Sequence, residues 1–336
     1  MKNWIARLFK GAPDKSHSPA ASGPAASPAA RGADPRAPTQ AGEDAPALEQ
    51  VFWRWLCGLP ADAAGEQAAS PAARQVESDL ARLAQAPEQA ADLVPRVPEV
   101  IPRLLGSLRE EGVSGAELAR QVARDPVLVA EVIREANSPF YRQTKPVRTV
   151  DAAILVLGQN GLRMLLARVA FRPIMGASSG PCARVAAPRL WLHAERCARA
   201  GALLAPRLGA DPFEAYLAGL MIDVGLIVAF RLVDQLQQSG PAPDQPERVS
   251  AIQAGARQLS ARIALYWDLP PPIGAAILRA GDAHAQPLAR ALGQADTLAR
   301  LRLLLDGGAL PPDDPLLANL DGPGARIFEQ LAPEPG

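Results

Sequence analysis

The amino-acid sequence predicts an all-α fold, and three observations support this prediction. Apolar residues recur three and four positions apart in several segments, which places them on one face of a helix. The pairs Asp125-Pro126 and Asp211-Pro212 each supply an N-cap residue followed by proline, which suits the first position of a helix. Sustained alternation of apolar and polar residues with hairpin turns, the pattern of β-strands, is absent from the sequence.

The N-terminal residues differ in composition from the rest of the chain. Residues 1–10 predict a short amphipathic helix, which would make a weak contact with a membrane or a partner through Trp4, Ile5, Leu8 and Phe9. The alternative is a frayed terminus, because so short a segment cannot hold a helix alone. Residues 11–47 are mainly Ala, Pro, Ser and Gly and cannot bury enough apolar surface to order themselves, so we predict a disordered tether there.

Apolar residues return in residues 48–92, which we predict to be a short helical N-terminal segment. Two blocks, 51–59 and 76–83, are rich enough in apolar residues for two short helices. The main helical domain is expected over residues 93–310, and residues 311–336 form a C-terminal tail or a short helix in this prediction.

Helix signals continue through the main domain. An apolar stripe over residues 97–108 predicts an amphipathic helix, and residues 114–117 form a capping box. A further helix is expected from Pro126 until Pro139 stops it. One long helix is expected to begin at Pro212 and to continue through 228. A break between helices is predicted around Gly158, and the sequence Trp-Asp-Leu-Pro at 267–270 is expected to end another helix.

Composition limits the classes of partner and compartment. Lys+Arg and Asp+Glu both number 35 in 336 residues, and the scattered arginines are interleaved with acidic residues, so we predict no nucleic-acid partner. The cysteines, Cys57, Cys182 and Cys197, are too widely spaced for a zinc knuckle or a disulfide framework. The longest apolar run is interrupted by Asp223, and residues 1–10 lack the apolar core of a secretory signal. We therefore expect a cytoplasmic protein.

A series of short motifs follows in a characteristic order. It comprises Val94-Pro95-Arg96-Val97-Pro98, Asp125-Pro126-Val127-Leu128, Ala136-Asn137-Ser138-Pro139, Leu157-Gly158, Trp191-Leu192-His193, Gly219-Leu220-Met221-Ile222-Asp223-Val224-Gly225 and Trp267-Asp268-Leu269-Pro270. The series resembles the HDOD family, which is related to the HD-type metal-dependent phosphohydrolases but usually lacks their ligand set. The resemblance implies a bacterial signalling domain of stacked helices that acts through protein contacts, so we expect a protein partner in a signalling pathway.

The resemblance also assigns structural positions. The residues that match its motifs, and that we expect to hold the helix junctions in register, are Asp125, Pro126, Asn137, Ser138, Gly158, Gly219, Gly225, Trp267 and Pro270.

The family pattern further implies a vestigial HD site. By this resemblance His193 matches the first ligand position, Asp223 the aspartate of the His-Asp pair, and Asp296 the final aspartate, whereas Ile222 stands where the histidine of the pair would be. The chain has only three histidines, so a dinuclear site with several imidazoles cannot be built. We predict no catalytic residue, no bound metal and no cofactor.

Two alternatives remain open at this point. One is a residual metal-dependent phosphohydrolase or phosphodiesterase that works with the ligands that are left. The other is a receptor that binds a nucleotide or a cyclic dinucleotide in the vestigial pocket. In the structural interpretation, the Asp223 carboxylate needs a donor in its buried helix, and His193, an arginine or backbone N–H groups could supply one.

Overall fold

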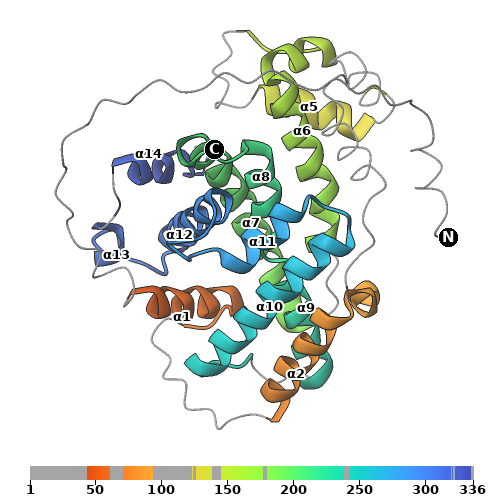
Figure 1. Cartoon of the computed structure of the whole chain (residues 1–336). Coiled ribbons are helices and arrows are strands. Elements are labelled where there is room, and N and C mark those ends of the chain that lie inside the picture. The colour runs from red at the N-terminus through yellow and green to blue at the C-terminus, as the bar shows by residue number, and fades with distance from the viewer. Residues whose placement is uncertain are drawn as a thin grey trace, which may run out of the picture. The chain divides into compact units, whose positions relative to one another are not determined.

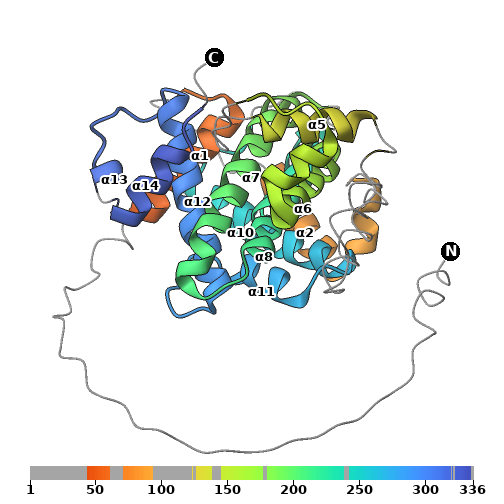
Figure 2. The same ribbon diagram turned by 90° about the horizontal axis from the view of Figure 1, so that it is seen from above.

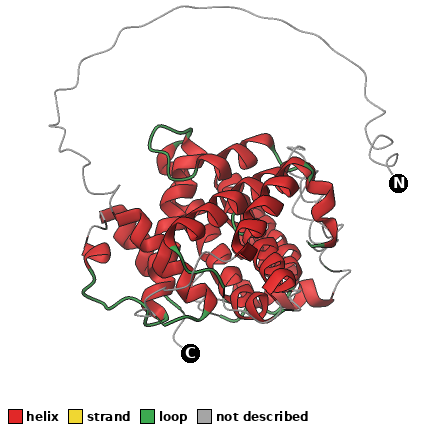
Figure 3. Cartoon of the chain, turned by 90° about the horizontal axis from the view of Figure 1, so that it is seen from below, coloured by secondary structure: helices red, strands yellow, loops and turns green. Residues whose placement is uncertain are grey.

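Helices account for every regular element in the part of the chain that the structure describes (Figure 3). The structure is a computed structural model that describes residues 44–60, 71–93, 126–137, 145–176, 180–237, 242–318 and 322–333, together with positions 123 and 320. The all-α prediction is therefore confirmed for these residues. The predicted features that lie outside them are the helix at 1–10, the tether as far as residue 43, the helix at 97–108, the capping box at 114–117, Asp125 and Ser138.

Proline marks the start of most helices. In the described residues nine helical elements begin at a proline, which has the φ angle of a helix and lacks an N–H that would have no partner there. The elements are α1 (Asp44–Cys57), α2 (Pro71–Gln85), η2 (Pro87–Asp92), α5 (Pro126–Ala136), α6 (Val150–Gly176), α7 (Pro181–Leu208), α8 (Pro212–Met221), α9 (Val224–Gln237), α10 (Pro246–Tyr266), α11 (Pro271–Arg279), α12 (Pro287–Asp306), α13 (Pro315–Ala318) and α14 (Gly322–Gln330).

Helix α7 lies at the centre of this arrangement and packs against α1, α6, α8, α9 and α12. Figure 1 shows α1 below α7 and α12, and α2 beside α9 and α10. Seen from above, α5 and α6 lie on one side of α7, and α12 and α14 lie on the other (Figure 2). Helices from both ends of the described chain therefore cover the central helices.

Two predicted helix junctions have the expected geometry. The Asp211 side chain accepts hydrogen bonds from the Phe213 and Glu214 N–H groups at 2.9 and 2.8 Å, as an N-cap does. The Asn137 amide links the end of α5 to the segment before α6, because Nδ2 donates to Val147 O at 2.8 Å and Oδ1 accepts from Val147 N at 2.7 Å. Asn137 therefore fixes two chain segments with one side chain.

The other junctions depend on unusual backbone angles. Gly158 has a φ of 67° and a ψ of 177°, which interrupts α6 where the sequence predicted a break. Helix α10 ends at Tyr266, and Asp268 follows with a φ of 56° before α11 begins after Pro270. Trp267, beside this turn, packs against Phe171 with ring centroids 6.1 Å apart.

The long apolar helix predicted from Pro212 through 228 is present, but its hydrogen bonding is interrupted at one point. The structure has two helices there, α8 and α9, with a break at Ile222 and Asp223. The Ser260 hydroxyl of α10 stabilises this break. It accepts a hydrogen bond from Gly225 N at 2.8 Å and donates one to Ile222 O at 2.9 Å. These two backbone groups would otherwise bond along the helix.

Two glycines allow α8 and α9 to pack closely against neighbouring helices. A Cβ atom at Gly225 would lie 1.9 Å from Ala256 O, and one at Gly219 would lie 2.5 Å from the Ala198 backbone. Only glycine fits at either position, so α8 and α9 approach their neighbours closely.

The apolar stretch over 212–236 is long enough to cross a membrane by length and composition, but 94% of its most apolar window is buried inside the fold. In the described residues this stretch is therefore a core element.

Candidate functional site

A fully buried histidine lies between two carboxylates at the centre of the fold. His193 on α7 is 0% exposed, and its Nδ1 lies 2.6 Å from Asp223 Oδ2, at the break between α8 and α9. Its Nε2 approaches Asp296 Oδ1 on α12 to 3.1 Å, which is an ionic contact without the alignment of a hydrogen bond. The structure thus brings together three of the four positions that the sequence placed at the vestigial HD site.

Two arginines complete this arrangement. Arg300 Nε, one helical turn after Asp296, donates to Asp296 Oδ1 at 2.8 Å. Arg257 Nη2 of α10 donates to Asp296 Oδ2 at 3.0 Å. Both oxygens of this carboxylate are therefore engaged by guanidinium groups. We call His193, Asp223, Asp296, Arg257 and Arg300 the His193 cluster.

The electrostatics of the cluster favour its charged forms. Burial lowers the pKa of His193, but the attraction of Asp223 and the contacts with both carboxylates outweigh it and raise the pKa to about 9. Burial raises the pKa of Asp296, but Arg300, His193 and Arg257 hold it well below its usual range. At neutral pH the cluster therefore has three cationic side chains against two carboxylates.

An aromatic side chain from the N-terminal segment covers the cluster. Phe52 of α1 is 0% exposed, and its ring centroid lies 4.8 Å from that of His193. The Arg300 guanidinium lies over the Phe52 ring, 4.8 Å from its centroid. The space beside the imidazole is consequently filled by a side chain of the same molecule.

Polar contacts hold α1 in this place. Trp53 Nε1 donates to Pro243 O at 2.6 Å, and Arg54 forms an ion pair with Asp244 at 2.9 Å. Gln50 also donates to Asp244, at 2.9 Å. Both ions of the Arg54–Asp244 pair are mostly shielded from solvent, so α1 is a fixed part of the site's surroundings.

The fourth predicted position, Ile222, does not enter the polar cluster. It is 4% exposed and belongs to the apolar core, while its carbonyl accepts the Ser260 hydroxyl. Of the structural positions, Gly219 and Gly225 support the close packing of α8 and α9 beside the cluster. Asn137, Gly158, Trp267 and Pro270 lie at helix junctions, and Pro126 begins α5.

The His193 cluster does not fit a divalent metal ion. A protonated imidazole has no lone pair to give, and both oxygens of Asp296 already accept from arginines. The excess of positive charge would also repel a cation. In the described residues no group of three or more His, Cys, Asp or Glu side chains is arranged to hold a metal.

The two arginines and Phe52 were not identified from the sequence as members of the site. Arg300 could have been found from its spacing, because it lies four residues after Asp296 on a helix, where ion pairs form. Arg257 and Phe52 reach the cluster only through tertiary packing, from positions 39 and 244 residues away from Asp296.

The described part of the chain is all-helical and is built around a buried cluster of histidine, carboxylate and arginine side chains. The family model of the HDOD domain matches residues 94–283, which is more than half of the chain. The chain therefore belongs to the HDOD domain family. Phe52 precedes the matched region, and Asp296 and Arg300 follow it.

Solved structures with the same fold include two bacterial proteins. An HDOD domain protein of unknown function from Geobacter sulfurreducens is 24% identical, with 76% of this chain and 89% of that chain covered and a TM-score of 0.55. A candidate metal-dependent phosphohydrolase from Shewanella amazonensis is 17% identical, with coverages of 78% and 98% and a TM-score of 0.53. At these identities the likeness concerns the fold.

One curated relative also matches the chain. It is an uncharacterised protein of Treponema pallidum, which is 19% identical over an alignment of 208 residues that covers 59% of this chain. The chain spans 40% of the length of that relative.

Proposed function

We propose that this chain is a non-catalytic, cytoplasmic signal-transduction protein of bacteria, which acts through protein–protein contacts of its HDOD domain. Membership of the HDOD domain family supports the general role. The observation that carries the non-catalytic part is the His193 cluster, in which guanidinium and imidazolium groups neutralise the carboxylates that a metal would need.

The burial of the cluster supports the same proposal. Asp223 is 1% exposed and His193 is 0% exposed, and Phe52 lies against the imidazole. A hydrolase needs a place for the scissile phosphate and for the attacking water close to the catalytic groups. A nucleotide receptor at the same position would need comparable room. We therefore place both alternatives second to a structural role for the cluster.

A hydrolysis assay tests the non-catalytic part. The purified chain is incubated with bis-p-nitrophenyl phosphate and Mn²⁺, in parallel with an Asp223→Ala variant. The proposal predicts that release of nitrophenol stays at the background rate for both proteins. Manganese-dependent turnover that disappears in the variant would overturn it, whereas equal turnover in both would identify a contaminant.

The surface of α10 and α11 is where we expect a protein partner to bind. Leu265, Tyr266 and Leu278 are large apolar side chains that are 43%, 51% and 50% exposed. Leu265 lies beside Gly274 of α11, and Leu278 follows one turn later on the same helix. Exposed apolar side chains that lie together on a surface commonly mark interaction sites.

Affinity capture with matched variants tests this contact. The immobilised full chain is exposed to a lysate of the native host, alongside Leu278→Glu and, as a control, Arg326→Glu on an exposed part of α14. The proposal predicts a protein retained by the wild type and by the control but lost with Leu278→Glu. Identical captured proteins for all three chains would contradict this placement of the contact.

A further inference from the structure

Helix α11 is apolar on both of its faces. Its inward face consists of buried residues, namely Ile273, Gly274, Ala276 and Ile277. Its outward face presents Pro271, Ala275 and Leu278, which are exposed and recur at the spacing of one helix stripe. A helix that is apolar all round is typically covered on every side, so the outward stripe of α11 is suited to contact with another molecule.

The last turn of α10 extends this stripe. Figure 1 shows α10 and α11 side by side, and the two helices pack closely, because a Cβ atom at Gly274 would lie 3.0 Å from Ala261 O. The same Cβ would lie 3.3 Å from Leu265 Cγ, so Leu265 and the neighbouring Tyr266 adjoin α11. We call the exposed residues Leu265, Tyr266, Pro271, Ala275 and Leu278 the α11 surface.

The two ends of α11 carry exposed charges of opposite sign. Asp268 lies three residues before the helix begins, and it makes no ion pair or side-chain hydrogen bond among the described residues. Arg279 is the last residue of the helix. Its Nε donates to Asp282 at 3.2 Å, but the two side chains are 57% and 38% exposed, and an ion pair in solvent contributes little to stability. A second carboxylate can therefore also bind this guanidinium, which has five N–H donors.

The charges around the α11 surface cancel. Arg262, one turn before Leu265 and Tyr266 on α10, is exposed, and together with Arg279 it balances Asp268 and Asp282. A strongly basic or acidic partner would find no net attraction here, whereas two copies of the chain would meet without net repulsion. In a contact with two-fold symmetry the same residues serve both copies. When two α11 helices run antiparallel, the Asp268 end of each faces the Arg279 end of the other.

We propose that the α11 surface binds a second copy of the chain, with the two α11 helices antiparallel about a two-fold axis and Asp268 of each copy paired with Arg279 of the other. This rests on the proposed function, because it names the partner at the surface where a protein contact is expected. Helix α11 has nine residues and is about 13 Å long, so the contact is small and the dimer dissociates in the micromolar range.

Sedimentation velocity of the purified full chain, over concentrations from about 1 to about 200 µM, tests the self-association. We expect a reversible shift from monomer to dimer within this range. A monomer at every concentration would overturn the proposal. Affinity capture from the host lysate separates this failure from that of the proposed function, because a different protein retained through Leu278 would still support a contact at this surface.

Variants locate the contact. Leu278→Glu is expected to weaken self-association about tenfold or more, because it brings a carboxylate into the apolar stripe. Leu236→Glu is the matched control, because Leu236 is 39% exposed on α9, and this variant should dimerise like the wild type. Equal dimerisation of the wild type and both variants would contradict the placement of the contact on α11.

A charge exchange tests the antiparallel arrangement. Asp268→Lys and Arg279→Glu are each expected to weaken the dimer, because each places like charges opposite one another. The variant with both substitutions restores opposite charges and should dimerise within about threefold of the wild type. A double variant weaker than either single variant would overturn the pairing of Asp268 with Arg279. Circular dichroism of each variant establishes that it is folded.

Discussion

Replacement of Arg300 by leucine is predicted to destabilise the protein substantially. Arg300 is 6% exposed, its Nε lies 2.8 Å from Asp296, and its guanidinium covers the Phe52 ring. Removal of one partner from a buried ion pair costs about 3–5 kcal/mol, because the other charge is left without compensation. Arg257 remains 3.0 Å from the second oxygen of Asp296, so we expect the lower end of this range, about 3 kcal/mol.

Urea denaturation followed by circular dichroism measures this loss as a lower midpoint at an unchanged slope. The exposed control Arg262→Leu should change the free energy of unfolding by less than about 0.5 kcal/mol. A double variant, Arg300→Leu with Asp296→Leu, should be more stable than the sum of the two single losses predicts, because the two side chains interact directly. A loss below about 1 kcal/mol for Arg300→Leu, or strict additivity in the double variant, would refute the assignment of a coupled structural ion pair.

Three further predictions concern the surroundings of the site. The two neighbouring carboxylates outweigh burial and raise the pKa of His193 to about 9. The protonated imidazole therefore contributes roughly 3 kcal/mol to the free energy of unfolding. This contribution is complete below about pH 6.5 and is lost as the pH rises through 9. Urea midpoints between pH 6 and 10 check this, and a midpoint that rises over that interval would oppose it. Gly225→Ala should lower the free energy of unfolding by about 3 kcal/mol, because its Cβ would lie 1.9 Å from a backbone oxygen of α10. The control Gly322→Ala, whose Cβ would meet no atom within 4 Å, should unfold at the wild-type temperature. Asn137→Ala should cost about 2 kcal/mol and speed hydrogen exchange at the Val147 amide, which loses its 2.7 Å acceptor, and unchanged exchange there would show that the amide is protected by something else.

Local signals in the sequence were sufficient to predict the helical class and several helix ends. Asp211 followed by Pro212, Gly158, and the turn after Tyr266 lie where the sequence placed them, because each depends on backbone angles and hydrogen bonds among neighbouring residues. The break at Ile222 and Asp223 was missed for the opposite reason. It depends on a hydroxyl that lies 35 residues further along the chain from Gly225.

The candidate site was predictable only in part. The sequence argument that a buried Asp223 carboxylate needs a donor named His193 as one candidate, and the two side chains lie 2.6 Å apart. The two arginines at Asp296 could not be predicted in this way, since Arg257 belongs to another helix. Phe52 belongs to a segment that the family resemblance did not cover, so its place against the imidazole could not be foreseen.

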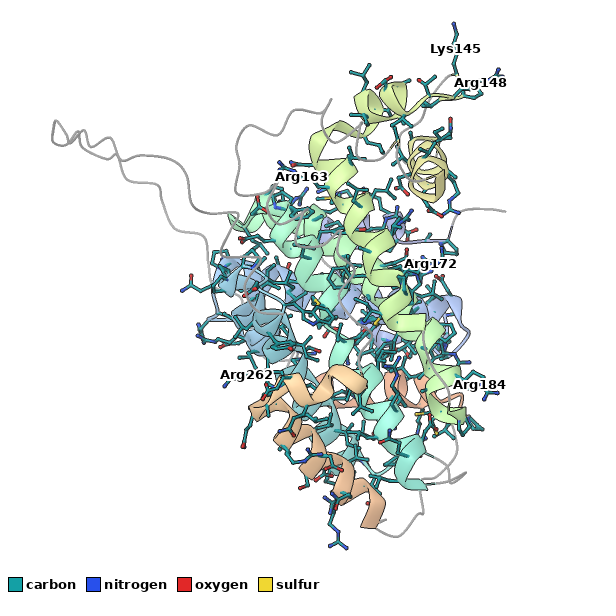
Figure 4. All side chains as sticks on the ribbon, turned by 90° about the vertical axis from the view of Figure 1, so that its right-hand side faces the viewer. Lys145, Arg148, Arg163, Arg172, Arg184 and Arg262 are labelled. Carbon is teal, nitrogen blue, oxygen red and sulfur yellow. The ribbon has the colours of Figure 1, made fainter. Side chains whose placement is uncertain are left out.

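Six basic side chains of the described residues are labelled in Figure 4, and they lie on several separate elements. Figure 4 shows Lys145 and Arg148 at one end, Arg163 and Arg172 along α6, and Arg262 on the other side, over separate elements. These six side chains do not form a continuous basic strip of the kind that follows the phosphate backbone of a nucleic acid. A direct binding assay tests the prediction that nucleic acid is not a partner.

Calorimetric titration of the purified chain with Mn²⁺ at neutral pH tests the central claim most directly, namely that arginine and imidazolium groups take the place of a metal at the His193 cluster. We expect no saturable heat of binding, in the wild type and in Asp223→Ala alike. Stoichiometric binding by the wild type that is lost in Asp223→Ala would contradict it.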